Sequence, residues 1–322
     1  MKALTLAKGG GLSVGRGRPE PPLKDGLALI RPVLAGICAT DLEISKGYMG
    51  FEGVPGHEFV GVVVKAPWAP ELEGKRVVGE INIPCGKCPS CLEGIGNHCP
   101  SRSVLGILGW DGVFADRFCL PIANLHLVPD SVGNEAAVFT EPLAAAYQIL
   151  EQVEFNPGMK TALLGPGRLG QLIARAFSAE GAPLAVIGRN KAKLDLLDGL
   201  PGVSPVLEKD AGAMAPFDVV IEATGSPKGM ARAMELVKPR GVIVLKTTVS
   251  RPAALDINTL VINEVSVIGS RCGPFPKAME ALEDGKVDPT PLVSRVTPLD
   301  EAKEAFSFAA SRKAMKVLLS FS

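Results

Sequence analysis

The feature that most constrains the fold is a glycine-rich turn between a short apolar strand pattern and an amphipathic helix pattern. The turn follows the apolar run 161–164, and apolar residues then recur at helical spacing up to residue 177. Its form is Gly-x-Gly-x-x-Gly, in which the glycines permit a tight turn, close backbone approach to a pyrophosphate and close packing of helix on strand. We therefore expect a dinucleotide here. The residues expected to contact it are Gly165, Gly167, Arg168, Leu169 and Gly170.

Strand and helix patterns alternate after this turn. This alternation predicts a parallel, doubly wound sheet, an α/β fold. The expected strands are 184–187, 217–223, 242–245 and 265–269, and the expected helices between them are 191–197 and 227–237. The remaining tail is expected to form helices near 277–283 and 300–309 and a last strand, 314–320.

The N-terminal part of the chain, up to about position 140, has a different texture, with short β-branched runs closely separated by glycine and proline turns. This pattern predicts many short strands in an irregular antiparallel barrel or sandwich. The expected strands there are 28–33, 59–64, 76–78 and 113–120. A chain of 322 residues with 47% hydrophobic and 21% charged residues is long enough for two domains with large cores.

The charge balance argues against two classes of partner. Lysine plus arginine and aspartate plus glutamate both number 34, so nothing favours nucleic acid or an anionic membrane. The N-terminus has no apolar signal-peptide core, and no apolar run reaches about 18 residues. We expect a soluble, cytoplasmic protein.

Four of the seven cysteines lie in one short loop with the spacing Cys-x2-Cys-x2-Cys-x7-Cys. Four thiolates in a chain without secretory features predict a tetrahedral zinc site. A disulfide framework is typical of small secreted proteins, and a redox Cys-x2-Cys needs a strand-to-helix context that this loop lacks. Four protein ligands leave zinc no open position, so we expect a structural role. The ligands are Cys85, Cys88, Cys91 and Cys99.

The residue after the second expected strand of the α/β region bears on the cofactor. NAD sites usually place an acidic residue there, whereas this chain has Arg189, with Gly188 before it. A guanidinium can bind the 2′-phosphate of NADP in a charge-assisted pair, and glycine leaves room for it. We therefore favour NADP over NAD; the alternative is that Arg189 is a solvated surface residue.

A second set of metal-ligand residue types is spread along the chain before and at position 141. It comprises Cys38 in Cys-Ala-Thr-Asp, His57 and Glu58 in Gly-His-Glu, and Glu141 in Glu-Pro-Leu. A lone buried cysteine is more often a small hydrophobe, and a lone histidine is more often structural. Cysteine, histidine and glutamate are nevertheless the ligand types of a zinc site with an open position.

Together these motifs, in this order, resemble the zinc-dependent medium-chain dehydrogenase/reductases of the alcohol dehydrogenase superfamily. The resemblance covers nearly the whole chain and is nearest to the polyol, threonine and glucose dehydrogenase branches. It implies a GroES-like catalytic domain over 1–141 with a structural zinc lobe at 80–102, a Rossmann domain over 142–271, and a C-terminal segment, 272–322, that returns to the catalytic domain.

The resemblance also implies roles for individual residues. Catalytic zinc would be held by Cys38, His57 and Glu141, with Glu58 either ligating directly or standing behind water, and Asp41 would orient His57. Thr40 would bind the substrate oxygen and relay its proton; relatives carry it onward with a histidine where this chain has Glu43. Thr224 and Lys316 would contact the cofactor, Lys316 at the pyrophosphate.

The expected reaction is hydride transfer between an alcohol or polyol and NAD(P), with two zinc ions per chain, one catalytic and one structural. Zinc would acidify the alcohol oxygen, much as it lowers the pKa of bound water to about 7. The rival interpretations are a zinc-free quinone or enoyl reductase of the same superfamily and a non-enzymatic NADP(H)-binding protein. The family commonly forms homodimers or homotetramers through an edge strand, here 265–269. The sequence does not separate polyols, sugars and simple alcohols.

Overall fold

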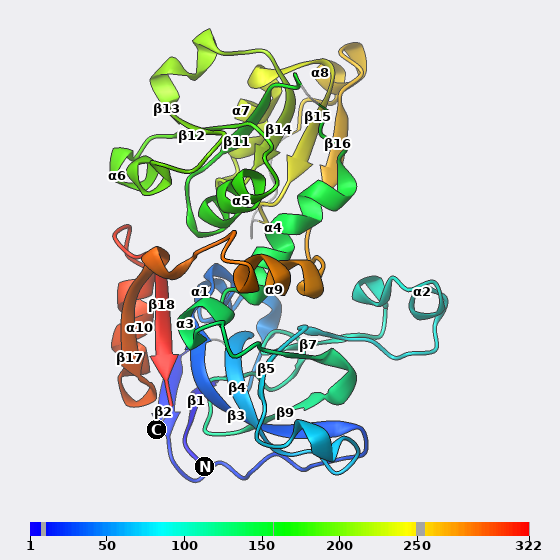
Figure 1. Cartoon of the computed structure of the whole chain (residues 1–322), viewed down its shortest axis with the longest axis vertical. Helices are drawn as coiled ribbons and strands as arrows, with labels where there is room; N and C mark the ends of the chain where they lie inside the picture. Colours follow the sequence, from blue (N-terminus) through cyan, green and yellow to red (C-terminus); the bar gives the residue numbers. More distant parts are fainter. Residues whose placement is uncertain (8–10, 157, 249–254, 322) are drawn as a thin grey trace. The chain divides into compact units, whose positions relative to one another are not determined.

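A computed structural model describes residues 1–7, 11–156, 158–248 and 255–321 (Figure 1). The chain divides into two compact units. The first unit comprises Met1–Glu141, Ala278–Asp284 and Asp288–Ser322, and the second comprises Pro142–Lys277 and Gly285–Val287. The sequence places the return of the C-terminal segment at residue 272, whereas in the structure the chain rejoins the first unit at Ala278.

The first unit is built on a seven-stranded, mainly antiparallel sheet, consistent with its closely spaced turn residues. Strands run in the order β10-β5-β4-β3-β18-β17, and β9 also pairs with β3. This sheet contains β3 (Leu27–Gly36), β4 (Glu58–Lys65), β5 (Arg76–Gly79), β9 (Phe118–Pro121), β10 (Leu125–Leu127), β17 (Val293–Pro298) and β18 (Lys316–Ser320).

Smaller elements complete the first unit. Two further sheets belong to this unit: one contains β1 paired with β2, and the other contains three strands in the order β6-β7-β8. Their strands are β1 (Ala3–Leu6), β2 (Leu12–Gly15), β6 (Asn82–Ile83), β7 (Ser103–Leu105) and β8 (Gly109–Trp110), and the helices are α1 (Ala39–Ile44), α2 (Pro89–Leu92), α3 (Asn134–Ala137) and α10 (Ala302–Ala309).

The second unit is a six-stranded parallel sheet with the order β13-β12-β11-β14-β15-β16. This is the strand order of a dinucleotide-binding fold. Successive strands are added on one side of β11 up to β13, and from β14 onward they are added on its other side. Its strands are β11 (Thr161–Leu164), β12 (Leu184–Gly188), β13 (Val203–Leu207), β14 (Phe217–Glu222), β15 (Val237–Leu245) and β16 (Ser266–Gly269); its helices include α5 (Arg168–Ala179), α6 (Lys191–Leu194), α7 (Gly229–Leu236) and α8 (Ile257–Ile262).

The core of the second unit explains why its strands are visible in the sequence. All four residues of β11 and all five of β12 are buried, as expected for strands covered on both faces. Residues of the sheet pack with one face of α7 in a single apolar cluster. The cluster includes Ala162, Leu164, Ile187, Val220, Ile243, Met230, Ala233 and Leu236.

Two regions differ from the sequence-based expectation. The apolar run 113–120 is a strand only from Phe118, because the amides of Val113 and Phe114 donate to the carbonyls of Gly56 and Pro55. This contact supports the loop before His57. The sequence-based boundary between the two domains falls after residue 141, whereas the structure has a helix, α4 (Thr140–Gln152), that runs through this position. Early proline is compatible with such a helix because the first-turn amides need no intrahelical acceptor.

Two expected helices differ from the pattern in their bounds or in their regularity. Helix α9 is Phe275–Glu283, and the expected helix 191–197 is α6 followed by a 3-10 turn, Asp195–Leu197. Among the described residues, the structure contains no helix with the length and apolarity required to cross a membrane. The expected cytoplasmic location stays a prediction.

Candidate active site and metal centres

The start of α1 fixes the first two residues of the site. Cys38 is the residue before the helix, and Asp41 occupies its first turn. The Cys38 amide donates to Asp41 Oδ2 at 2.8 Å, half of a capping-box arrangement that satisfies an amide left open at a helix start. Asp41 is fully buried. The side chain of Asp41 therefore has one oxygen committed to the backbone of Cys38.

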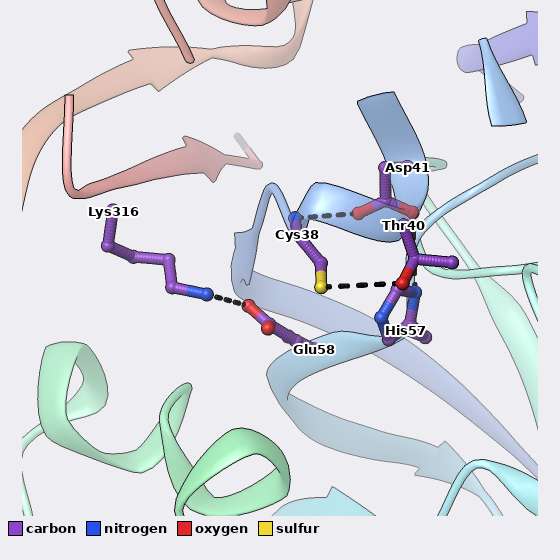
Figure 2. Close-up of polar contacts among 6 residues, drawn as sticks. All are labelled: Cys38, Thr40, Asp41, His57, Glu58 and Lys316. Atoms are coloured by element: carbon purple, nitrogen blue, oxygen red, sulfur yellow. Dashed lines mark hydrogen bonds and ion pairs between the residues drawn. The ribbon is translucent and has the colours of Figure 1, made fainter. Parts of the chain in front are cut away.

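The other oxygen of Asp41 faces His57, which precedes β4. His57 Nδ1 lies 3.3 Å from Asp41 Oδ1, and Figure 2 shows the second ring nitrogen on the side of Cys38. Burial tends to lower the pKa of His57, but the Asp41 carboxylate and Cys38 outweigh it, so this pKa stands well above the usual value. A metal that binds the second ring nitrogen must displace a proton.

Three residues form a compact ligand group in the first unit. One atom each of Cys38, His57 and Glu58 lie within 4.8 Å of one another. Glu58 is fully buried, and its Oε1 has no hydrogen-bond partner among the described residues. An uncompensated buried carboxylate oxygen is costly, and a cation would satisfy it. Thiolate, imidazole and carboxylate are also ligand types that zinc accepts, so this group fits the metal.

Three other predicted residues have different surroundings. Thr40 Oγ1 lies 3.8 Å from Cys38 Sγ, at the edge of the ligand group. Glu141 lies half-buried in the first turn of α4 and is not a member of the group found among the described residues. Glu43 forms a surface ion pair with Lys46, with 2.7 Å between the carboxylate oxygen and Nζ.

Lys316 has a different partner from the pyrophosphate that the resemblance implies. It is the first residue of β18, it is buried, and its ammonium forms an ion pair with Glu58 Oε2 (Figure 2). The sequence could not show this because Glu58 and Lys316 are 258 positions apart. The strand pairing β18-β3-β4 brings them together.

The four-cysteine loop forms a second ligand group. The sulfur separations are 3.4 Å for Cys88–Cys91, 3.7 Å for Cys88–Cys99 and 3.9 Å for Cys85–Cys91. A tetrahedron with zinc–sulfur bonds of about 2.3 Å has edges of about 3.8 Å, so these thiols are already spaced for zinc.

The thiols of this loop differ in acidity. Backbone amides at Lys87 and Cys88 lower the pKa of Cys85 to about 6. The pKa of Cys88 is raised to about 11: a backbone hydrogen bond at Cys91 lowers it, but burial and the neighbouring thiols outweigh that effect. Cys85 therefore becomes a thiolate easily, whereas deprotonation of Cys88 is disfavoured. A bound divalent cation would favour the thiolate form of both residues.

In the second unit, the three glycines of the turn after β11 have distinct surroundings. Gly165 has φ = +100°, which disfavours other residues, and a Cβ on Gly170 would lie 2.0 Å from the Gly165 carbonyl oxygen. Gly167 instead has nothing within 4 Å of its Cβ position, which leaves the backbone accessible at the start of α5. This combination fits a pyrophosphate at the helix N-terminus.

The residues expected near the adenosine end lie beside further cations. Arg189 is exposed at the end of β12, and the neighbouring α6 carries Lys193. Burial, together with the charge of Arg168, lowers the pKa of Lys193. The sequence pattern does not single out Lys193, although it lies in the cationic run after residue 188. Gly188 proves to be a packing residue, because a Cβ there would overlap the ring of Pro166.

Thr224 follows β14, on the other side of β11. Its backbone amide and hydroxyl both donate to Glu222 Oε1, at 2.9 and 2.5 Å. The backbone of Thr224 also limits the turn, because a Cβ on Gly165 would lie 2.9 Å from its Cα. Thr224 therefore shapes the turn after β11; its contact with a cofactor stays a prediction.

Comparisons with known proteins agree with the two units. Residues 24–130 match the family described as the alcohol dehydrogenase GroES-like domain, and residues 134–321 match the glucose dehydrogenase C-terminus. Sorbitol dehydrogenase of Halalkalibacterium halodurans is 27% identical over 340 residues, covering 99% of each chain.

Two solved structures are similar over nearly the whole length. A zinc-binding dehydrogenase from Sinorhizobium meliloti, bound to NADP, has a TM-score of 0.89 and 27% identity, covering 99% of this chain and 98% of that one. An alcohol dehydrogenase from Escherichia coli CFT073, complexed with NADH, has a TM-score of 0.90 and 26% identity, covering 100% and 99%.

The chain belongs to the zinc-dependent medium-chain dehydrogenase/reductases, in the branch of the polyol dehydrogenases. It is an NAD(P)-dependent oxidoreductase that transfers a hydride between an alcohol or polyol and the nicotinamide cofactor. The predicted fold class, a GroES-like unit plus a Rossmann-type parallel sheet, is confirmed. These matches favour the zinc-dependent enzyme over the zinc-free and non-enzymatic alternatives.

Proposed function

We propose that the chain oxidises a polyol with NADP at a zinc held by Cys38, His57 and Glu58. The observation that carries this proposal is the compact ligand group, in which a buried oxygen of Glu58 has no hydrogen-bond partner among the described residues. When bound, zinc would supply a Lewis acid to the substrate oxygen and NADP would supply the hydride acceptor. The chain's own residues provide orientation and proton transfer.

Asp41 and Thr40 have separate tasks in this proposal. Asp41 holds Nδ1 of His57 and so leaves the other ring nitrogen for the metal. The hydroxyl of Thr40, 3.8 Å from Cys38 Sγ, takes up the proton of the substrate alcohol as it releases its own hydroxyl proton to water, so that Thr40 stays neutral. Glu43 is a proton carrier only if its surface ion pair with Lys46 opens, so we assign the first transfer to Thr40 alone.

We assign the third ligand position to Glu58 rather than Glu141. Glu58 contributes an oxygen to the ligand group, and its buried Oε1 has no hydrogen-bond partner among the described residues. Glu141, in the first turn of α4, lies outside this ligand group. A second, structural zinc on the four-cysteine loop would bring the total to two per chain.

The preference for NADP rests on cations at and near the end of β12. Arg189 follows this strand, and on the neighbouring α6 burial, together with the like charge of Arg168, lowers the pKa of Lys193. A 2′-phosphate would relieve this repulsion and form charge-assisted hydrogen bonds. An NAD site would instead need an acceptor for the ribose hydroxyls at position 189.

Comparison of kcat/KM for the two cofactors tests this preference. Arg189→Ala should lower kcat/KM for NADP about tenfold or more, because one charged hydrogen bond contributes about 1.5–3 kcal/mol, and should leave NAD nearly unaffected. Lys191→Ala is the matched control, since the Lys191 ammonium is paired with Asp195 at 2.7 Å. A wild-type enzyme that prefers NAD would refute the assignment.

We also propose that two copies associate through the edge strand β16. This strand ends the parallel sheet, and the adjacent α8 exposes large apolar side chains, with Ile262 at 79% and Val261 at 70%. Edge strands and exposed apolar patches both favour pairing. Sedimentation should give a dimer or tetramer, and Val261→Lys should shift it towards monomer; a monomeric wild type would contradict the proposal.

The activity is tested with a panel of polyols, sugars and simple alcohols, following the absorbance of the reduced nicotinamide. We expect polyols to give the highest kcat/KM. Thr40→Val should lower kcat about 100-fold or more, whereas Thr40→Ser keeps the hydroxyl and should retain most activity. Equal activity of Thr40→Val and wild type would remove Thr40 from the mechanism.

A further inference from the structure

Lys316 is a buried cation with two defined neighbours. It is 3% exposed, its Nζ forms an ion pair with Glu58 Oε2, and the same atom lies 5.5 Å from the centroid of the Phe139 ring. Figure 2 shows the lysine reaching Glu58 from the side opposite His57. Burying an ammonium is costly unless it is paired, so the Glu58 carboxylate and the face of the Phe139 ring together stabilise the buried charge of Lys316.

The sheet is built to allow this ion pair. Strand β3 lies between β18 and β4, and Gly36 of β3 pairs with Leu318 on one side and with Glu58 on the other. A Cβ on Gly36 would overlap Glu58 Oε2 and would lie 3.1 Å from Val138 Cγ1. Glycine at position 36 therefore leaves the space in which Oε2 meets the lysine.

The two oxygens of Glu58 consequently have different surroundings. Oε2 is held by Lys316, whereas Oε1 is buried without a hydrogen-bond partner among the described residues. The carboxylate also belongs to the ligand group with Cys38 and His57. A carboxylate whose second oxygen is tied to an ammonium can offer a metal only one oxygen.

We propose that Lys316 is a positioning residue that restricts Glu58 to one-oxygen ligation of the metal. This inference rests on the proposed metal site of Cys38, His57 and Glu58. Without the lysine, the freed carboxylate would turn both oxygens to the metal. The cation would then be bound more tightly, and the position that a substrate oxygen requires would be filled.

A purely supporting role for Lys316 makes the opposite prediction. If the lysine only stabilised the sheet, its loss would weaken metal binding and activity together. Restriction of Glu58 predicts instead that metal affinity rises while kcat falls. The charge of Lys316 acts in the same direction, since removing a cation beside the site favours a second cation.

The test compares Lys316→Met with wild type and Lys316→Arg, which keeps the charge and a donor. Zinc affinity is measured by chelator competition. Of the two zinc-binding phases of wild type, the one that Cys38→Ala lacks belongs to the site of Cys38, His57 and Glu58. Lys316→Met should bind zinc about tenfold more tightly, equivalent to about 1.4 kcal/mol, with kcat reduced at least as much. Cobalt substitution should show weaker visible absorption, as expected when the coordination number increases.

Unchanged or weaker zinc binding and an unchanged cobalt spectrum in Lys316→Met would overturn the inference. If Lys316→Met does not fold, Gly36→Ala provides the second variant, because its methyl group displaces Oε2 from the lysine and should produce the same rise in affinity. Failure of the proposed function is distinguishable: Cys38→Ala would then bind zinc with the same two phases as wild type.

Discussion

Replacement of Asp41 by asparagine tests how the ligand group is organised. The carboxylate accepts from the Cys38 amide at 2.8 Å with one oxygen and faces His57 Nδ1 at 3.3 Å with the other. An asparagine has only one oxygen. If this oxygen keeps the Cys38 amide, its NH2 group faces Nδ1, which must then lose its hydrogen to accept.

The consequence for His57 is a change of tautomer. Accepting at Nδ1 moves the proton to Nε2, the nitrogen that the metal requires. Loss of a group that orients a histidine ligand typically lowers metal affinity 10- to 100-fold. At about 1.4 kcal/mol per tenfold change, Asp41→Asn should therefore weaken zinc binding by about 1.4–2.8 kcal/mol.

The assay is chelator competition followed by zinc analysis. Wild type should lose zinc in two phases, of which Cys38→Ala retains only the one that belongs to the four-cysteine loop. In Asp41→Asn the Cys38-dependent phase should shift to lower chelator concentration while the other stays in place. Asp41 does not orient His57 for the metal if Asp41→Asn loses zinc in the same two phases as wild type, or if both phases shift equally.

Two further predictions concern the nucleotide turn and the cysteine loop. Gly170→Ala places a methyl group 2.0 Å from the Gly165 carbonyl oxygen. It should therefore lower the free energy of unfolding by about 1–3 kcal/mol in denaturant titrations. Gly167→Ala has open space around its methyl group, so it should weaken cofactor binding without loss of stability. Equal stabilities of the two variants would contradict this assignment. In protein stripped of zinc, the pKa of Cys85 is lowered to about 6 from 9.0, so the stability that its thiolate contributes is fully present above pH 9 and is lost as the pH falls through 6. Protease cleavage within 80–102 should accordingly increase as the pH falls from 9 to 6, and a rate independent of pH would exclude this role for Cys85.

The sequence predicts the second unit well because its determinants are local. Strands of a parallel sheet are buried on both faces, so β11 and β12 appear as continuous apolar runs, and the glycine motif fixes what lies between strand and helix. Spacing alone likewise predicts the four-cysteine loop, since all four thiols lie on the short segment from Cys85 to Cys99.

The candidate active site is less predictable because its contacts are distant in sequence. Residue types point to Cys38 and His57, and the family resemblance implies Asp41, but no pattern reveals that Lys316 pairs with Glu58 across strand β3. The apolar run at 113–120 misleads for a related reason. The first part of this run forms backbone hydrogen bonds with the loop before His57 and is not part of a strand. An apolar pattern indicates burial, but it does not distinguish a buried loop from a buried strand.

The most direct test of the central claim is to measure zinc content and NADP reduction together in wild type and Cys38→Ser. Wild type should hold two zinc ions per chain and should reduce NADP when a polyol is present. Cys38→Ser should retain one zinc ion, remain folded and lose the activity. A Cys38→Ser protein that keeps wild-type turnover, or a wild type that is fully active with zinc only on the four cysteines, would contradict it.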